Sequence, residues 1–512
     1  MAARRLMTIG IPSSFRKLPL SGIDFGVWVA VLLPRLLYWR LTGVAYEDAY
    51  ISLRYAENLA RGVGLVYNPG EWVFGASTPL HVILLAAWAR LGLPALPTAQ
   101  TIGAIADALT ATIWCRWLRE AFPTPCPAGM FVALGALSPL LVEPAVSGME
   151  TPLVMFCFTL AIAAARRRRP ASMGFALGLM ALARPDALLA EAILLLLVAR
   201  EWRPWWRSLA VMLLVLAPWL IGATLAYGTP LPHSIVAKDA AYRTHRPMQA
   251  WNLVHTLGSI APIAGTPGQR AVNLLVFPLA LVGAGWWWGV WGALGRAVPL
   301  TAIAYWAYLV LPGTLLFRWY FPPFLWLVYL LAAGGLGRFL ARAWEEWRWL
   351  GRWIPIAVTV YALGWCAVAA RDARRIALAE QEVRRGIGRL LAVIAPPDAV
   401  VATEPIGYVG YYSRRRILDE VGLVSPQMVP LVRAGAGWFA AMVDRFEPEW
   451  IVERPGFLLA NRTINTGVAM FRTDRQRRDF HRRYEAVVQF ASWRLTRRMF
   501  TPYHFIVYRR RP

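Results

Sequence analysis

Long apolar segments recur through the first 370 residues, and they limit the fold more than any other feature of the sequence. A helix needs roughly 20 mostly apolar residues to cross a bilayer. Candidate segments lie at 23–41, 77–93, 99–119, 127–147, 151–165, 171–183, 186–199, 208–226, 272–292, 297–315, 321–337 and 353–370. Several are short, as tilted or re-entrant helices are. We therefore predict a polytopic α-helical membrane protein with about 11–13 transmembrane helices.

The composition supports this class. Hydrophobic residues make up 58% of the 512 residues and charged residues only 16%, whereas about 25% of the residues in a soluble domain are charged. The net charge of +25 does not point to nucleic acid. Much of the arginine lies in short runs between apolar segments, where it marks the cytoplasmic side. Such runs are found at 166–169, 200–207 and 338–352.

The same charge bias predicts which loops face the exterior. Counting from a cytoplasmic N-terminus, the external parts are 44–76, 147–150, 183–186, 228–271, 317–323 and the tail after 370. Three apolar segments lie between the first two of these loops, although two external loops must be separated by an even number of crossings. One of the three is therefore not a simple span, or one of them contains a break. Pro94 and Pro97 favour 77–119, and the sequence leaves the choice open.

The last part of the chain, 371–512, has a different pattern. Its apolar runs are short and alternate with polar residues, as at 399–403, 450–453 and 504–508, which is typical of strands. We predict a transmembrane catalytic domain over 1–370. We predict a soluble, extracytoplasmic α/β accessory domain over 371–512, within the usual size of a domain.

The first external loop, 44–76, carries the strongest functional signal. Glu47 and Asp48 follow directly on the first span, where charges are costly unless they face water, protein or a substrate. A carboxylate with a like-charged neighbour has a raised pKa and suits the work of a general base. The alternative is an acidic pair that only favours a helix N-terminus through the helix dipole. We favour the catalytic interpretation because aromatic and glycine residues follow, up to the turn at 68–71.

The run DAYISLRYAENLARGVGLVYNPGE from Asp48, followed by STPL at 77–80, resembles the first external loop of the GT-C superfamily of membrane glycosyltransferases. It is similar to the bacterial branch that includes the mycobacterial terminal arabinosyltransferases. Glu47 stands where that branch has aspartate, and His81 where it has tryptophan. Further similar motifs lie at Ser147–Thr151, Leu182–Leu189, Gly228–Arg243, Phe317–Pro323 and Ala402–Pro426, so the resemblance covers nearly the whole chain.

The resemblance implies an inverting glycosyltransferase with a polyprenyl-phosphate sugar donor, acting on the outer face of a bacterial cytoplasmic membrane. Glu47 or Asp48 would be the catalytic base, and the sequence leaves open which. A phosphate leaving group needs cations rather than a general acid. Candidates for binding it are Arg54, Arg184, Lys238 and Arg318. Lys238 is the sharpest, because the chain has only one other lysine, whereas an arginine here is more often a membrane anchor.

Other residues of these motifs are candidates for contacts with the sugar or the acceptor. They are Tyr55, Glu71, His81, Glu150, Asp186, His233 and Tyr320. Glu150 and Asp186 could equally favour the start of the helices that follow them. We expect no cofactor; a divalent metal is possible, but the chain has no HxxxH or DxD pattern. The sugar would be arabinose or a hexose such as mannose, and the acceptor a glycan, lipid or protein of the cell envelope.

Two rival interpretations remain at this point. A transporter or flippase of lipid-linked sugars would need discontinuous helices and polar residues at the membrane midplane in related halves. The sequence has no such internal symmetry, and its acids lie at a membrane boundary. A catalytically inactive relative would not need Glu47 and Asp48, and both are present.

Overall fold

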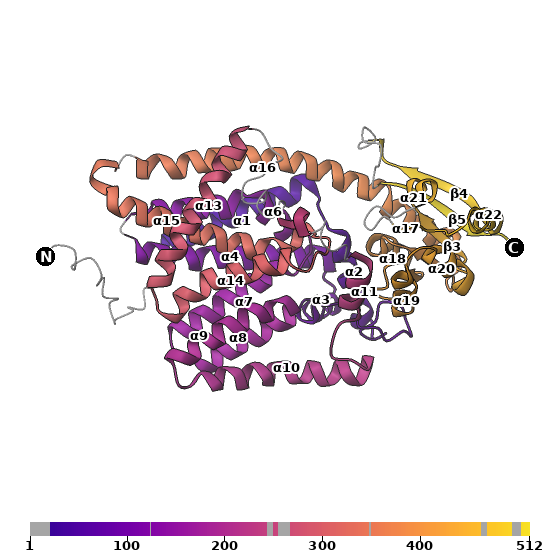
Figure 1. Cartoon of the computed structure of the whole chain (residues 1–512), viewed down its shortest axis with the longest axis horizontal. Coiled ribbons are helices and arrows are strands. Elements are labelled where there is room, and N and C mark those ends of the chain that lie inside the picture. The colour runs from indigo at the N-terminus through magenta and orange to yellow at the C-terminus, as the bar shows by residue number, and fades with distance from the viewer. Residues whose placement is uncertain are drawn as a thin grey trace.

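The computed structural model describes residues 21–122, 124–242, 249–253, 267–347, 350–461, 468–493 and 503–512. Helices dominate the chain, and a five-stranded sheet lies near the C-terminus. Figure 1 shows a bundle of long helices, with the sheet and its short helices gathered at one end. This arrangement confirms the predicted fold class, an α-helical membrane protein with a small α/β part at the end of the chain.

Five helical stretches in the described part of the chain are long and apolar enough to cross a membrane. They are α1 (Gly22–Thr42), α10 (Trp205–Tyr227), α14 (Ala293–Val310), α15 (Pro322–Trp347), and α16 (Leu350–Glu382) continued by α17 (Arg384–Ile394). Large side chains on α1 and α10 point outward, with Leu37 51%, Leu214 72% and Leu225 83% exposed. Exposed apolar side chains along a helix that satisfies its own backbone hydrogen bonds are typical of a surface that faces lipid. The chain is a multi-pass membrane protein.

Other predicted spans form helices that are short for a bilayer. They have 12 to 16 residues each: α3 (Pro79–Arg90), α7 (Thr151–Arg166), α8 (Pro170–Ala183) and α9 (Leu188–Glu201). Their lengths of about 18–24 Å fall below a hydrocarbon core of about 30 Å. Two longer helices complete the bundle, α4 (Ala95–Ala121) and α13 (Pro267–Gly289). The total of 11–13 crossings stays a prediction.

Two breaks interrupt the apolar stretch before Ser147, where the predicted count of crossings was uneven. The suspected segment 77–119 is two helices, α3 and α4, joined by a turn. The next segment is also divided: α5 (Cys126–Leu137) and α6 (Pro139–Ala145) meet at an angle of 53°. Pro139 lacks a backbone N–H, which favours a break in the helix at this point. The sequence left open which segment is irregular and favoured 77–119, whereas the sharp bend lies between α5 and α6.

The tail contains a mixed sheet with the strand order β2-β1-β3-β5-β4. Its strands are β1 (Val400–Thr403), β2 (Arg416–Asp419), β3 (Trp450–Glu453), β4 (Tyr484–Ala491) and β5 (His504–Arg510). β1 is parallel to β2 and β3, whereas β5 is antiparallel to both β3 and β4. The helices around it are α18 (Ile406–Ser413), η3 (Pro426–Met428), α19 (Val429–Ala434), α20 (Trp438–Phe446), α21 (Pro455–Ala460) and α22 (Asp474–Arg483).

The join between the bundle and the tail is helical. α16 runs without interruption through the predicted boundary at 370 and ends at Glu382. Two predicted external loops also contain helices, α2 (Glu47–Ala60) and α11 (His233–Tyr242). Figure 1 shows α2 and α11 where the bundle meets the tail, close to α18 and α19. The predicted site residues on α2 and α11 therefore lie near this junction.

Candidate active site

Helix α2 presents two different faces. Residues 47, 50, 54 and 57 recur at intervals of three and four, so their side chains share one face of the helix. That face contacts the tail; for example, the rings of Tyr50 and Tyr408 lie 4.2 Å apart. On another face, Asp48 and Ser52 line a cavity. The two neighbouring acids of the motif thus point to different surroundings.

The cavity has a volume of about 500 Å³ and is built from segments far apart in the sequence. Leu423 is the only tail residue among the described residues that line it. Its charged lining residues are Asp48, Glu150, Arg184, Asp186, Lys238 and Asp239. All of these except Asp239 were predicted from the sequence as site residues. The structure therefore brings predicted residues from four separate motifs around one space.

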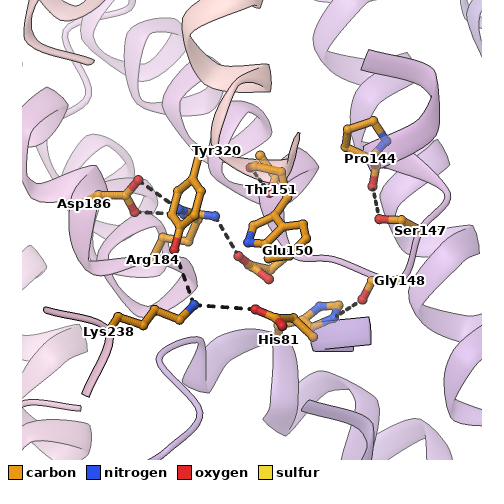
Figure 2. A network of polar contacts seen from close by, with 12 residues as sticks. His81, Pro144, Ser147, Gly148, Glu150, Thr151, Arg184, Asp186, Lys238 and Tyr320 are labelled. Atoms are coloured by element: carbon orange, nitrogen blue, oxygen red, sulfur yellow. Dashed lines mark hydrogen bonds and ion pairs between the residues drawn. The ribbon is translucent and has the colours of Figure 1, made fainter. Parts of the chain in front are cut away.

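Arg184 donates hydrogen bonds to two acidic residues that line the cavity, as Figure 2 shows. Its Nε and Nη2 donate to the two carboxylate oxygens of Asp186 at 2.8 and 3.1 Å, and its Nη1 donates to Glu150 at 3.0 Å. The guanidinium lies 5.0 Å from the centre of the Tyr320 ring. Arg184 is only 6% exposed, so its charge is balanced internally by two carboxylates, as a buried charge requires.

Lys238 reaches the same space from α11. Its Nζ lies 3.5 Å from the Asp48 carboxylate and 3.3 Å from the Tyr320 hydroxyl. The side chains of Lys238 and Asp48 keep 27% and 21% of their surface accessible. Burial alone would lower the pKa of the Lys238 ammonium, but Tyr320 and Asp48 together outweigh it and raise that pKa. Lys238 is therefore a permanent cation beside an accessible carboxylate.

Glu47 points away from this cavity. Its Oε1 accepts a hydrogen bond from the backbone N–H of Gly407, at the start of α18 in the tail. Burial, and after it the neighbouring Asp48 carboxylate, raise the pKa of Glu47 well above its usual range. Of the two acids, Asp48 is the one that lines the cavity.

Three further predicted site residues stabilise the external loop or its contact with the tail. Arg54 is buried and donates to the backbone carbonyls of Gly410 and Arg415 at 2.8 and 2.7 Å. The Tyr55 hydroxyl donates to the carbonyl of Val73 at 2.7 Å. Glu71 accepts from the side chains of Asn68 and Arg416 at 2.9 and 2.6 Å. None of these three is among the lining residues of the cavity, so their predicted contacts with the substrate stay predictions.

Three more residues that were predicted for the site are also absent from the lining of the cavity: His81, His233 and Arg318. His81 is buried, with Nε2 3.1 Å from the carbonyl oxygen of Gly148. The Nδ1 atom of His233 accepts from the backbone N–H of Phe74 at 3.2 Å. Arg318 donates to Glu143 at 2.9 Å, while 59% of its side chain stays exposed. Its neighbours Phe317, Trp319 and Tyr320 do line the cavity, so the predicted motif is at the site although its arginine faces elsewhere.

Solved structures of other proteins show the same architecture. ArnT from Cupriavidus metallidurans, in the apo state, matches 94% of this chain and 97% of its own, with a TM-score of 0.60 and 14% identity. An oligosaccharyltransferase from Archaeoglobus fulgidus, tethered to an acceptor peptide, matches 96% of this chain and 74% of its own, with a TM-score of 0.54 and 11% identity. The chain has the GT-C fold. At the level of the fold, this confirms the resemblance drawn from the sequence.

Two comparisons of sequence each match a part of this chain. The terminal β-(1→2)-arabinofuranosyltransferase of Mycobacterium tuberculosis is 27% identical over 252 residues. The match covers 43% of this chain and only 39% of that relative, well under two thirds of its length. A family described as a domain of unknown function (DUF8728) matches residues 372–508, which corresponds closely to the predicted accessory domain.

Two features of the cavity and its surroundings were not expected from the sequence. Asp239 directly follows Lys238 on α11, and Tyr242 lies one helical turn further on; both line the cavity. Their position in the Gly228–Arg243 motif was the available signal. The second unexpected feature is Glu143, which is buried. Its carboxylate accepts hydrogen bonds from the hydroxyls of Tyr38 and Tyr46, each at 2.9 Å, and from the side chain of Arg318. It lies inside an apolar segment, 127–147, where nothing in the pattern indicated a site.

Metal binding has no ready set of ligands in the described residues. Across the ranges that the structure describes, no three His, Cys, Asp or Glu side chains come together in a way that could hold a metal ion. The expectation that the protein needs no cofactor stays a prediction.

Proposed function

We propose that this chain is an inverting glycosyltransferase that moves a sugar from a polyprenyl-phosphate donor to a cell-envelope acceptor. The observation that carries the proposal is the pair formed by Asp48 and Lys238, 3.5 Å apart on the wall of a cavity of about 500 Å³. A volume of this size suits a small-molecule site. A base and a cation side by side are what the transfer needs, one for the acceptor hydroxyl and one for the phosphate.

Lys238 is the group that binds the donor phosphate. Lys238 and Arg184 are the two cations among the described lining residues. Arg184 already donates to two carboxylates, whereas Lys238 has one long ion pair with Asp48. A lysine ammonium binds phosphate as a point charge. This single cation is matched to a donor with one phosphate group.

Asp48 is the general base. The acceptor hydroxyl oxygen attacks the anomeric carbon while the bond from that carbon to the phosphate oxygen breaks. Asp48 takes the proton of the hydroxyl, and the bonding electrons leave with polyprenyl phosphate, whose negative charge Lys238 stabilises. A single displacement of this kind inverts the anomeric carbon. Glu150 and Asp186, held in place by Arg184, accept hydrogen bonds from sugar hydroxyls.

The mouth of the cavity suits a lipid. Leu188, Leu189 and Ile235 line it and are 48%, 39% and 46% exposed, so apolar surface borders the charged pair. A prenyl chain gains about 25 cal/mol for each Å² of apolar surface that it buries there. ArnT from C. metallidurans, which has the same fold, has been solved bound to undecaprenyl phosphate (TM-score 0.58, 14% identity). This supports a lipid-linked donor for our chain.

The sugar is arabinose or a hexose such as mannose, and the acceptor is a glycan, lipid or protein of the cell envelope. The partial match to an arabinofuranosyltransferase favours arabinose. We place the cavity and the tail on the outer face of the bacterial cytoplasmic membrane, in keeping with the cytoplasmic arginine runs at 166–169 and 200–207.

The test is transfer by the purified chain in lipid nanodiscs. Polyprenyl-phosphate arabinofuranose and polyprenyl-phosphate mannose are supplied separately, with arabinan and mannan oligosaccharides as acceptors. We expect extension of one acceptor and release of polyprenyl phosphate with one donor, both lost in Asp48→Asn. The rival activity, transport, is measured in vesicles as movement of the labelled donor across the bilayer. Such movement without any extended product, and unchanged in Asp48→Asn, would favour a transporter and overturn the proposal.

A further inference from the structure

The tail segment 406–417 binds the external loop through backbone atoms. Arg54 donates to the carbonyls of Gly410 and Arg415. The Tyr67 hydroxyl donates to the carbonyl of Ile406 at 2.5 Å. Asn68 pairs with both backbone groups of Ile417, at 3.0 and 2.9 Å. Each contact joins residues more than 300 positions apart in the chain. The tail therefore packs directly on the external loop that carries the two acids.

Two glycines allow this close approach. A methyl group at Gly407 would lie 2.0 Å from the backbone oxygen of Glu47, and one at Gly410 would lie 1.8 Å from the Tyr67 hydroxyl. Both distances are far shorter than a carbon–oxygen contact can be. The first clash is with backbone, so α2 or α18 would have to move to relieve it. Gly407 therefore sets the distance between α2 and α18, and Gly410 sets how closely α18 approaches Tyr67 of the external loop.

Glu47 completes the contact at the end of α2 that carries Asp48. Its carboxylate accepts from the N–H of Gly407, one of the backbone donors at the start of α18 that lack partners within the helix. The Glu57 carboxylate holds the other end of the same face, through the Tyr411 hydroxyl and the Arg414 side chain. Contacts at both ends oppose rotation of α2, and rotation of α2 is what would turn Asp48 away from Lys238.

We propose that the tail domain orients the catalytic base, and that Glu47 is a positioning residue that acts through Asp48 rather than on the substrate. This rests on the proposed function in one respect, the assignment of Asp48 as the base. It gives the domain of unknown function at 372–508 a role in the transfer step: α18 holds α2 at the rotation in which Asp48 faces the cavity.

The experiment compares kinetic constants in full-length variants. Gly407→Ala and Glu47→Ala should lower kcat by about tenfold to a hundredfold, as expected for a base displaced by about 1 Å. The donor KM should change less than about twofold, because Lys238 and the apolar mouth are untouched. Glu47→Gln keeps an oxygen acceptor for the Gly407 N–H and should recover most of the loss. Gly456→Ala is the matched control, since a methyl group there meets no atom within 4 Å.

A double variant tests the contact even if single variants fold poorly. Gly410→Ala clashes with the Tyr67 hydroxyl, so adding Tyr67→Phe should restore part of both the folded yield and kcat. Such a rescue shows coupling between the two positions. Unchanged kcat in Gly407→Ala and Glu47→Ala, in a chain that Asp48→Asn inactivates, overturns the positioning role alone. Full activity of Asp48→Asn instead overturns the proposed function.

Discussion

The two faces of α2 carry similar residues and have different environments. The face with Asp48 and Ser52 borders the cavity, and its polar atoms stay partly accessible. The face with Glu47 and Arg54 is bound to the tail, and its polar atoms bond to backbone groups of α18 and the residues after it. Consecutive residues on a helix point about 100° apart. Two acids next to each other can therefore divide into one that does chemistry and one that holds the structure.

The strongest way to break this comparison is to neutralise each acid in turn. Asp48→Asn should lower kcat by about 10²–10⁴, the usual contribution of a general base. Glu47→Gln should stay within about tenfold of the wild type, because it keeps the acceptor for Gly407. Transfer assays with one donor measure both. Equal losses in the two variants would mean that the acids do not have separate roles.

The second test concerns the cation of the cavity face. Lys238→Met keeps most of the volume of the side chain and removes the charge that we propose stabilises the leaving phosphate. We expect kcat to fall by about 10²–10³, as for the loss of one donor to a developing anion. Lys238→Arg serves as the control, and should recover part of the rate because it keeps a positive charge. A wild-type rate in Lys238→Met would remove Lys238 from the transfer step.

The third test uses a buried carboxyl group on the tail side. Burial raises the pKa of Asp419 to about 6, although backbone N–H groups of Val424 and Val421 oppose the shift. A raised pKa means that the folded state holds the proton more tightly than the unfolded state does. The stability advantage of the protonated group should therefore be lost as the pH rises from about 4 to about 6, by about 3 kcal/mol.

Thermal unfolding of the wild type and of Asp419→Asn measures this pH effect. Other groups titrate in both chains, so the quantity of interest is the difference between them at each pH. That difference should change between about pH 4 and pH 6 and stay constant above about pH 6. A constant difference across the whole range would contradict the raised pKa of Asp419.

Arg54 gives a test of intermediate size. The sequence predicted that it binds the donor phosphate, whereas the structure has it bonded to two carbonyls of the tail. Arg54→Met should lower the free energy of unfolding by about 2 kcal/mol, since buried acceptors lose their partner. The donor KM should stay near the wild-type value, which steady-state kinetics at several donor concentrations can establish. A KM raised more than about tenfold would return Arg54 to the donor site.

The smallest effect is expected at the rim, the exposed edge of the contact between the external loop and the tail. Glu71 and Arg416 form an ion pair of 2.6 Å, but 58% of the arginine side chain is exposed. Exposed ion pairs contribute about 1 kcal/mol or less. Arg416→Ala should therefore leave kcat within about twofold and shift thermal unfolding only slightly. A large loss of activity would mean that the rim, and not the glycine contact, controls the orientation of α2.

Many of the residues that line the cavity were named from the sequence. Asp48, Glu150, Arg184, Asp186, Lys238 and Tyr320 were all named from motifs, and all line one cavity. The helical spacing of 47, 50, 54 and 57 was also readable from the sequence, and it would have separated Glu47 and Arg54 from Asp48. What that face contacts was not readable, because its partners lie more than 300 residues away.

The sequence alone determined the membrane class, the presence of a small α/β part near the C-terminus and the residue types around the cavity. Apolar length, charge bias and local motifs are properties of neighbouring residues, and short-range physics sets them. Only the tertiary structure decided that α5 and α6 bend apart, that Arg184 is neutralised by two acids, and that Glu47 faces the tail. These depend on contacts between distant segments, and a pattern along one chain does not record which segments meet.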